Sequence, residues 1–362
     1  MIKDIHTELQ DIQILSSAPC RVDIGGTWDL KCFALPFAHI HPVTTNIALS
    51  MRTHIRLSAY KAGRIRIWDN QHEEEYPADD LDLSGHFGFL FSVSAHFALS
   101  GIDIEIGYES PPRSGLGGSG VLAVALAGAL AKAREPVGND TLTPEAIVEL
   151  VYNIEDGLRY SYTGLQDQCA AAFGGIHRWH WTYGEMDSKF RREELLSTEG
   201  YTRTSDHLLV AYIGENHDSN DVNSKQVTDF LSGTNRSQWF RINEIANEFA
   251  HALQQEDWKA AGERINEETD IRCSIVPSRI TPVGESLQAI CHEMGVGFAT
   301  AGGGNGGCVW ALAQNPDQIA DLSSGWEAIL KPIPTATLLP VTVEPQGLLV
   351  EKITIEADAK RP

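Results

Sequence analysis

The strongest constraint on the fold is a glycine-rich segment that leads directly into a long apolar run. Residues 115–120 read GLGGSG, and Pro111 and Pro112 come shortly before them. Residues 121–132, VLAVALAGALAK, carry no charge before the final lysine. This run is about half of the roughly 20 residues that a membrane-spanning helix needs. We therefore expect a buried helix at about 119–134 that is entered through a glycine loop.

The composition is that of an acidic globular chain. Its 362 residues are 42% hydrophobic, and 28 basic against 49 acidic side chains give a formal net charge of −21. At about 100 to 200 residues per domain, this length predicts two domains. Such a scarcity of cations argues against a nucleic-acid or membrane partner, because phosphate-rich surfaces bind clustered lysine and arginine.

Cysteine usage and the N-terminal residues favour a cytoplasmic protein. The six cysteines include no C-x-x-C pair, so neither a disulfide framework nor a zinc ribbon is predicted. The first residues, MIKDIHTELQ, mix charges of both signs, unlike a signal peptide. The sequence does not indicate an oligomeric state.

Hydrophobic periodicity predicts an α+β fold in two halves. Residues 12–69 alternate apolar and polar positions as strands of one sheet do, and further alternating runs follow at 103–109 and near residue 176. Helices are expected at 87–99, 119–134 and 143–159. The charged stretch at 187–206 suggests a boundary, which we set between 1–195 and 196–362. Beyond it we expect a strand at 208–213, several helices between 221 and 294, and strands near 297, 309, 338 and 349.

The glycine segment also satisfies G-x-G-x-x-G, the pattern of dinucleotide-binding folds, and Glu135 lies 20 residues after Gly115. In those folds the glycines follow a strand directly, and the helix leads into a second parallel strand with the acid at its end. Here residues 111–114 intervene, and a loop and another helix follow. A nicotinamide-dependent oxidoreductase is therefore the weaker interpretation. A Walker A loop is absent, because no Gly-Lys-Ser/Thr follows the glycines.

A glycine loop at a helix N-terminus is a site for an anion such as phosphate. Unpaired N–H groups and the positive end of the helix dipole favour negative charge, and glycines allow the backbone to approach phosphate oxygens. Ser119 at the helix start is placed to cap the helix or to offer its hydroxyl to a metal bound between phosphates. The alternative is that the segment is only a tight turn and a cap.

Three segments in order along the chain resemble the motifs of the GHMP small-molecule kinases, which include galactokinase, mevalonate kinase, fucokinase and heptose-phosphate kinases. They are APCRVDIGGTWDL at 18–30, PPRSGLGGSG at 111–120 and AGGGNGGCVWAL at 301–312. A fourth, NIEDGLRYSYTGLQDQCAAAFGGI at 153–176, is similar to heptose-phosphate kinases and fucokinases. The resemblance implies an N-terminal half with a left-handed βαβ element, a ferredoxin-like C-terminal half and an active site between them. It also implies transfer of the γ-phosphoryl group of Mg-ATP to a hydroxyl of a small-molecule sugar or sugar phosphate.

The resemblance further implies a role for each matched residue. Asp167 corresponds to the general base, Arg21 to the arginine beside the transferring phosphoryl group, and Ser119 with Glu155 to the Mg²⁺ ligands. The ATP-binding loop would comprise Pro111, Ser114, Gly115, Leu116, Gly117, Gly118, Ser119 and Gly120. The acceptor would lie against Asp29, which suits sugar hydroxyls, and against Gly26, Trp28, Gly303 and Gly304.

Each role has an ordinary structural alternative. Asp167 could cap a local N–H group, and Asp156 could face inward in place of Glu155. Arg21 could pair with Asp23, and Trp28 could be a packing residue.

The chain also departs from the family pattern. Gly118 replaces a serine, Asn305 interrupts the late glycine run, and Cys169 stands where heptose kinases often carry tyrosine. The histidine pairs His39/His41 and His177/His180 lack a third ligand at zinc spacing. A non-catalytic regulator that binds a sugar and ATP on the same fold remains an alternative.

Overall fold

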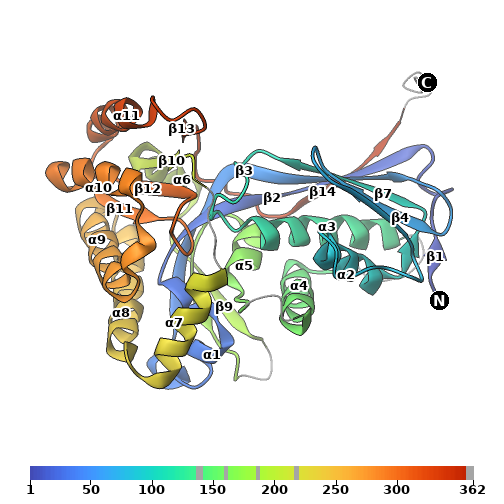
Figure 1. Cartoon of the computed structure of the whole chain (residues 1–362), viewed down its shortest axis with the longest axis horizontal. Coiled ribbons are helices and arrows are strands. Elements are labelled where there is room, and N and C mark those ends of the chain that lie inside the picture. Colours follow the sequence, from blue (N-terminus) through green and yellow to red (C-terminus); the bar gives the residue numbers. More distant parts are fainter. Residues whose placement is uncertain (136–141, 159–161, 185–187, 216–219, 356–362) are drawn as a thin grey trace.

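The computed structural model describes residues 1–135, 142–158, 162–184, 188–215 and 220–355. It is an α+β structure with one large mixed sheet and one smaller antiparallel sheet (Figure 1). Most of the large sheet lies at the right of Figure 1, and the smaller sheet lies at the left. The α+β fold class is confirmed.

The large sheet has the strand order β14-β2-β3-β7-β4-β5, and β8 and β9 extend it from β3. Its strands pair antiparallel except β4 and β7, which are parallel and have α2 in the connection between them. A separate short pair joins β1 (Lys3–Asp4) to β6 (Leu99–Ser100). The strands of the large sheet are β2 (Ile12–Ile24), β3 (Val43–Ala59), β4 (Arg64–Trp68), β5 (Glu73–Pro77), β7 (Ile102–Tyr108), β8 (Ile176–Trp181), β9 (Phe190–Glu194) and β14 (Leu349–Thr354).

Helices cover one face of the large sheet, and α3 lies along it (Figure 1). Alanine and glycine dominate α3, which lets it approach the sheet closely. A Cβ on Gly128 would lie 2.8 Å from Leu348 Cδ2. The helices of this half are α1 (Lys31–Ala34), α2 (Gly88–Phe97), α3 (Gly118–Arg134), α4 (Pro144–Leu158) and α5 (Gln166–Phe173), with 3-10 turns at Gly26–Asp29 and Ala38–Ile40.

The smaller sheet has the order β11-β12-β10-β13, and its strands pair antiparallel. Local signals set several helix starts here: Thr281 and Asn315 each cap a helix whose first residue is proline. The strands are β10 (Leu208–Tyr212), β11 (Gly297–Thr300), β12 (Cys308–Leu312) and β13 (Thr337–Leu339). The helices are α6 (Thr198–His207), α7 (Asn220–Ser232), α8 (Arg236–Gln254), α9 (Trp258–Ile275), α10 (Pro282–Met294) and α11 (Pro316–Leu330), with a 3-10 turn at Pro277–Arg279.

The charged stretch that suggested a domain boundary is structured where it is described. Residue 187 lies outside the described residues, but β9 pairs with β8 in the large sheet and α6 follows it. The chain also returns to the large sheet at its C-terminal side, because β14 pairs with β2. A single cut between 195 and 196 therefore does not separate the two sheets. The expected helix at 143–159 ends at Leu158, and residue 159 lies outside the described residues.

Among the described residues, no helix has both the length and the apolar character that crossing a membrane requires.

Candidate active site

The glycine loop turns directly into the N-terminus of α3. Gly115 and Gly117 have φ angles of +77° and +89°, a conformation that residues with a side chain rarely adopt. Because α3 begins at Gly118, the N–H groups of its first turn have no partner within the helix. Gly118 and Ser119 are exposed at this end. The loop therefore offers a site for an anion such as phosphate.

Asp167 lies in the first turn of α5, with its side chain against the glycine loop. A Cβ on Gly120 would lie 2.9 Å from Asp167 Cβ, and a Cβ on Gly117 would lie 3.2 Å from the Asp167 carboxyl carbon. Glycine at these two positions leaves room for the carboxylate. The candidate base and the candidate phosphate loop are thus packed together.

Arg21, on β2, is buried and contacts both Asp167 and the loop. Its Nε donates to Asp167 Oδ1 at 2.8 Å, and its Nη2 lies 2.6 Å from the same oxygen. Its Nη1 donates to the Gly115 carbonyl at 2.9 Å and lies 3.1 Å from Asp23 Oδ1. Burial alone would lower the pKa of Arg21, but the charges of Asp167 and Asp23 raise it above the usual value. Arg21 therefore pairs with Asp23 and with Asp167 at the same time.

Two further carboxyl groups lie near Asp167. Burial, followed by the charge on Asp167, raises the pKa of Asp29 to about 7 and that of Glu155 to about 8. The two glutamines that flank Asp167 bind these acids: Gln166 N–H donates to Asp29 Oδ2 at 3.2 Å, and Gln168 Nε2 donates to Glu155 Oε2 at 2.8 Å. Raised pKa values at neighbouring carboxyls are the result of burial and mutual repulsion of negative charge.

This set of donors fits Mg²⁺. The ion prefers oxygen ligands, usually one or two carboxylates together with phosphates and water. Glu155 offers a carboxylate that lies near other negatively charged carboxylates, among them Asp167. Ser119 offers an exposed hydroxyl at the start of α3. Asp156, the alternative to Glu155, is exposed, whereas Glu155 is half-buried and bound by Gln168.

The expected sugar contact of Trp28 is corrected by the structure. Trp28 is fully buried, and its Nε1 donates to the Trp239 carbonyl at 2.8 Å. Its ring meets Phe33 and Phe230 edge to face and stacks on Phe240, with centroid distances of 5.7 to 6.1 Å. Both faces of the indole are occupied by the core, so Trp28 joins the first motif to α8 and is not open to a ligand.

The late glycine segment packs on the first glycine loop, backbone against backbone. Cys308 N–H donates to the Ser114 carbonyl at 2.7 Å. The first glycine loop is also bound to β2, because Arg21 N–H donates to the Leu116 carbonyl at 3.2 Å. A Cβ on Gly302 would lie 2.8 Å from the Gly115 carbonyl oxygen. Ser114 and Leu116 are buried anchors of the loop, whereas Pro111 at its entry is half-buried.

Two buried arginines, which the sequence motifs do not mark, hold the late glycine segment. Arg279 donates from Nη1 to the Gly303 carbonyl at 2.7 Å and from Nη2 to the Gly302 carbonyl at 2.8 Å. Arg272 donates to the same Gly302 oxygen at 3.2 Å and to Glu268 Oε1 at 3.2 Å. Burial, together with the charge of Arg272, lowers the pKa of Arg279 to about 9. The only sequence signal was the i, i+4 spacing of Glu268 and Arg272 on one helix.

The same two arginines pack closely against Gly26 and Gly304, two further glycines of the expected substrate site. A Cβ on Gly26, where φ is +62°, would lie 2.9 Å from Trp239 and 3.5 Å from Arg272 Cζ. A Cβ on Gly304 would lie 2.5 Å from Arg279 Cγ. Asn305, which interrupts the glycine run, has a φ of +59°, and its N–H donates to the Arg279 carbonyl at 2.6 Å. Asparagine tolerates this left-handed conformation better than most residues.

The position of Glu135 does not fit the dinucleotide-binding interpretation, which needs this acid at the end of a second parallel strand. Glu135 follows the last residue of α3 and forms an ion pair with Lys132 at 2.8 Å. The next described element is α4, so the described residues provide no second parallel strand with Glu135 at its end.

Comparison with known proteins agrees with this geometry. Residues 87–175, which include the glycine loop and Asp167, match the GHMP kinases N terminal domain. Comparison with curated proteins gives no match.

Solved structures of the same fold cover nearly the whole chain. A D-glycero-D-manno-heptose 1-phosphate kinase from Bacteroides thetaiotaomicron has a TM-score of 0.70 at 18% identity, over 94% of this chain and 99% of that chain. Lactococcus lactis galactokinase complexed with galactose has a TM-score of 0.71 at 12% identity, over 94% and 95%. Streptococcus pneumoniae phosphomevalonate kinase, in complex with phosphomevalonate and AMPPNP, has a TM-score of 0.69 at 15% identity, over 94% and 99%. The suspected resemblance to the GHMP kinases is thereby confirmed: residues 87–175 match the N-terminal domain of that family, and the chain as a whole has the fold of these solved kinases.

Proposed function

We propose that this protein is a cytoplasmic kinase that transfers the γ-phosphoryl group of Mg-ATP to a hydroxyl of a sugar or sugar phosphate. The observation that carries the proposal is the contact between Asp167, Arg21 and the glycine loop at the start of α3. Phosphoryl transfer depends mainly on positioning and on neutralising charge, and these three elements supply a phosphate site, a cation and a proton acceptor side by side. The six free cysteines are typical of a reducing compartment.

Asp167 and Arg21 have complementary roles in this proposal. The Asp167 carboxylate accepts the proton of the acceptor hydroxyl as the bond to phosphorus forms. Arg21 fixes that carboxylate through two nitrogens and, from the same guanidinium, binds the carbonyl of Gly115 in the loop. Arg21 therefore fixes the position of the base relative to the loop. It is also close enough to the loop to offset negative charge on a bound phosphate.

Ser119 and Glu155 would hold Mg²⁺. When bound, the ion neutralises charge on the phosphate oxygens. Its positive charge would oppose the burial and repulsion that raise the pKa of Glu155, so that Glu155 would be ionised in the loaded enzyme. The backbone N–H groups at the start of α3, from Gly118 onward, would bind the phosphates themselves.

The choice of a sugar acceptor rests on Asp29. Its carboxyl lies beside Asp167 and is bound by only one backbone N–H among the described contacts, from Gln166. The remaining lone pairs can accept hydrogen bonds from the hydroxyls of a diol. The solved structures of similar fold include a heptose 1-phosphate kinase and a galactokinase, but also mevalonate and phosphomevalonate kinases.

An acceptor screen tests the proposal. Purified protein with Mg-ATP would be supplied with hexoses, deoxyhexoses, heptoses and their phosphates, and with mevalonate and phosphomevalonate as acceptors that carry no sugar ring. We expect ADP release with at least one sugar or sugar phosphate and a new phosphorus NMR resonance from its ester.

Other results would change the assignment. ADP release with mevalonate or phosphomevalonate alone would keep a kinase and refute the sugar. Binding of nucleotide and sugar without ADP release over the whole panel would instead favour a non-catalytic regulator on the same fold.

A further inference from the structure

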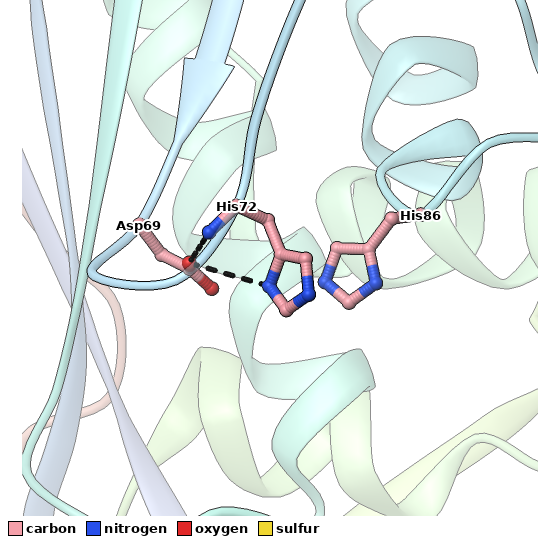
Figure 2. A group of neighbouring side chains, drawn as sticks. All are labelled: Asp69, His72 and His86. Atoms are coloured by element: carbon pink, nitrogen blue, oxygen red, sulfur yellow. Dashed lines mark hydrogen bonds and ion pairs between the residues drawn. The ribbon is translucent and has the colours of Figure 1, made fainter.

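Three side chains that commonly bind metals meet at an edge of the first half, away from the glycine loop. Asp69 follows β4, His72 precedes β5, and His86 comes shortly before α2. Figure 2 shows the two imidazole rings side by side, with the Asp69 carboxylate next to His72. Taking one ligand atom from each residue, the three atoms lie within 4.8 Å of one another.

The turn between β4 and β5 holds two of these groups in place. Asp69 Oδ1 accepts hydrogen bonds from the N–H groups of Gln71 and His72, both at 2.8 Å. The same oxygen lies 3.7 Å from His72 Nδ1. The carboxylate is therefore oriented by backbone, and its second oxygen is not used by these bonds.

The third group comes from a different segment that is tied to the same hairpin. His86 N–H donates to Glu74 Oε1 at 2.9 Å, which holds the segment before α2 against β5. The His72 and His86 rings stack with a centroid distance of 4.0 Å and an interplanar angle of 19°. Because imidazole lone pairs lie in the ring plane, rings stacked in this way direct them along near-parallel lines, and at least one ring must rotate before two nitrogens can face one ion.

We propose that Asp69, His72 and His86 bind one divalent transition-metal ion of the zinc class, with water in the remaining position. Two imidazoles and one carboxylate suit Zn²⁺ and its neighbours, whereas Mg²⁺ prefers oxygen ligands. Bonds of about 2.0–2.2 Å to a tetrahedral ion bring ligand atoms to about 3.3–3.6 Å from one another. The three ligand atoms now lie within 4.8 Å of one another, and rotation of the exposed side chains of His72 and His86 would bring them to that spacing.

The bound ion would connect the β4–β5 turn to the start of α2. In Figure 1, β4 and α2 lie at the right of the molecule, whereas α5, which carries Asp167, is near its centre. The ion would therefore cross-link the β4–β5 turn and the segment before α2, which lie 14 positions apart at His72 and His86, and raise stability without touching the phosphate loop. This site does not depend on the proposed kinase activity.

A zinc titration tests the site. Protein without a histidine tag would be stripped with a chelator and titrated with Zn²⁺ by calorimetry, with Mg²⁺ in excess to occupy oxygen-only sites. The wild type is compared with His72→Ala, with His86→Ala and with the control His96→Ala, which removes an exposed imidazole from α2 outside the cluster. We expect one high-affinity equivalent in the wild type and in the control, and binding at least about tenfold weaker in both cluster variants.

Thermal unfolding and a spectroscopic probe complete the test. Zn²⁺ should raise the Tm of the wild type and of His96→Ala, and should raise it far less in His72→Ala and His86→Ala. Circular dichroism of the metal-free variants shows whether they fold, and the milder His72→Gln replaces any that does not. Equal Zn²⁺ affinity in all variants, no binding to the wild type, or a thiolate charge-transfer band with Co²⁺ would each overturn the proposal.

Discussion

Two glycines of the phosphate loop differ sharply in the space around them, although they are only two residues apart. A Cβ on Gly118 would meet nothing within 4 Å, whereas a Cβ on Gly120 would lie 2.9 Å from Asp167 Cβ. We therefore expect Gly118→Ala to keep nearly full kcat. Gly120→Ala should displace Asp167 and lower kcat by about 10- to 100-fold. Steady-state kinetics on an acceptor from the screen checks both, and an equal effect of the two substitutions would contradict the packing argument.

A buried histidine gives a prediction for the pH dependence of stability. His177, on β8, is buried, and burial lowers its pKa to about 4 from a usual 6.5. Between these values the unfolded chain binds a proton that the folded chain does not. The free energy of unfolding therefore rises with pH across this window, and the contribution of His177 is lost as the pH falls from 6.5 toward 4.

The substitution His177→Gln isolates this contribution. Urea unfolding at several pH values between 4.5 and 7.5 should show a shallower rise for His177→Gln than for the wild type, by up to about 1.4 kcal/mol per pH unit. The matched control His54→Gln changes a histidine on β3 whose side chain is 46% exposed, and it should keep the wild-type slope. Parallel curves for His177→Gln and the wild type would refute the assignment.

At the scale of residues, contiguous motifs were predictable and distant packing was not. The glycine loop and the Gln-Asp-Gln segment carry their meaning within a few positions, and the structure packs Gly120 against Asp167. The burial of Trp28 depends on Phe230 and Trp239, which come some two hundred positions later in the chain. Arg279 was missed because no local pattern indicates that it binds two carbonyl groups of the late glycine segment.

Among the structural elements, the late glycine segment is bound by the side chain of Arg279 at two successive carbonyl groups. Arg279 gives its two terminal nitrogens to the carbonyls of Gly303 and Gly302. Arg279→Met leaves the Gly303 carbonyl without this donor and should lower the free energy of unfolding by about 2 kcal/mol. The control Arg56→Met removes an exposed pair with Glu105 and should cost less than about 1 kcal/mol. Urea denaturation measures both, and equal losses would show that Arg279 does not hold the segment.

Helices with a strong internal pattern were predicted nearly to the residue, and short or charged elements were not. α3 begins at Gly118 and α2 ends at Phe97, close to the expected limits, because a glycine loop and a stretch of apolar residues define them. α5 has only eight residues and was not among the expected helices. β9 was hidden by its charges: FRREE has one buried residue, and the strand exists because it pairs with β8.

At the scale of the whole molecule, the C-terminal strand couples the end of the chain to its beginning. β14 pairs with β2, and Val350 Cγ2 would lie 3.1 Å from a Cβ on Gly128 in α3. Val350→Asp places a charge against this helix and should lower the free energy of unfolding by about 2 kcal/mol or more. The loss would be measured as a lower urea midpoint of the protein. The exposed neighbour Glu351 provides the control Glu351→Gln, which should leave the midpoint unchanged. A Val350→Asp variant with the wild-type midpoint would show that β14 is not part of the cooperative unit.

The central claim is that Asp167 accepts a proton while phosphate is bound at the start of α3. The most direct test compares Asp167→Asn with Asp156→Asn, an exposed aspartate beside Glu155, in the transfer of phosphate from Mg-ATP to an acceptor that the wild type uses. The account predicts that Asp167→Asn lowers the single-turnover rate by at least about 100-fold while nucleotide affinity stays nearly unchanged, and that Asp156→Asn behaves as the wild type. Transfer by Asp167→Asn at the rate of Asp156→Asn would contradict it.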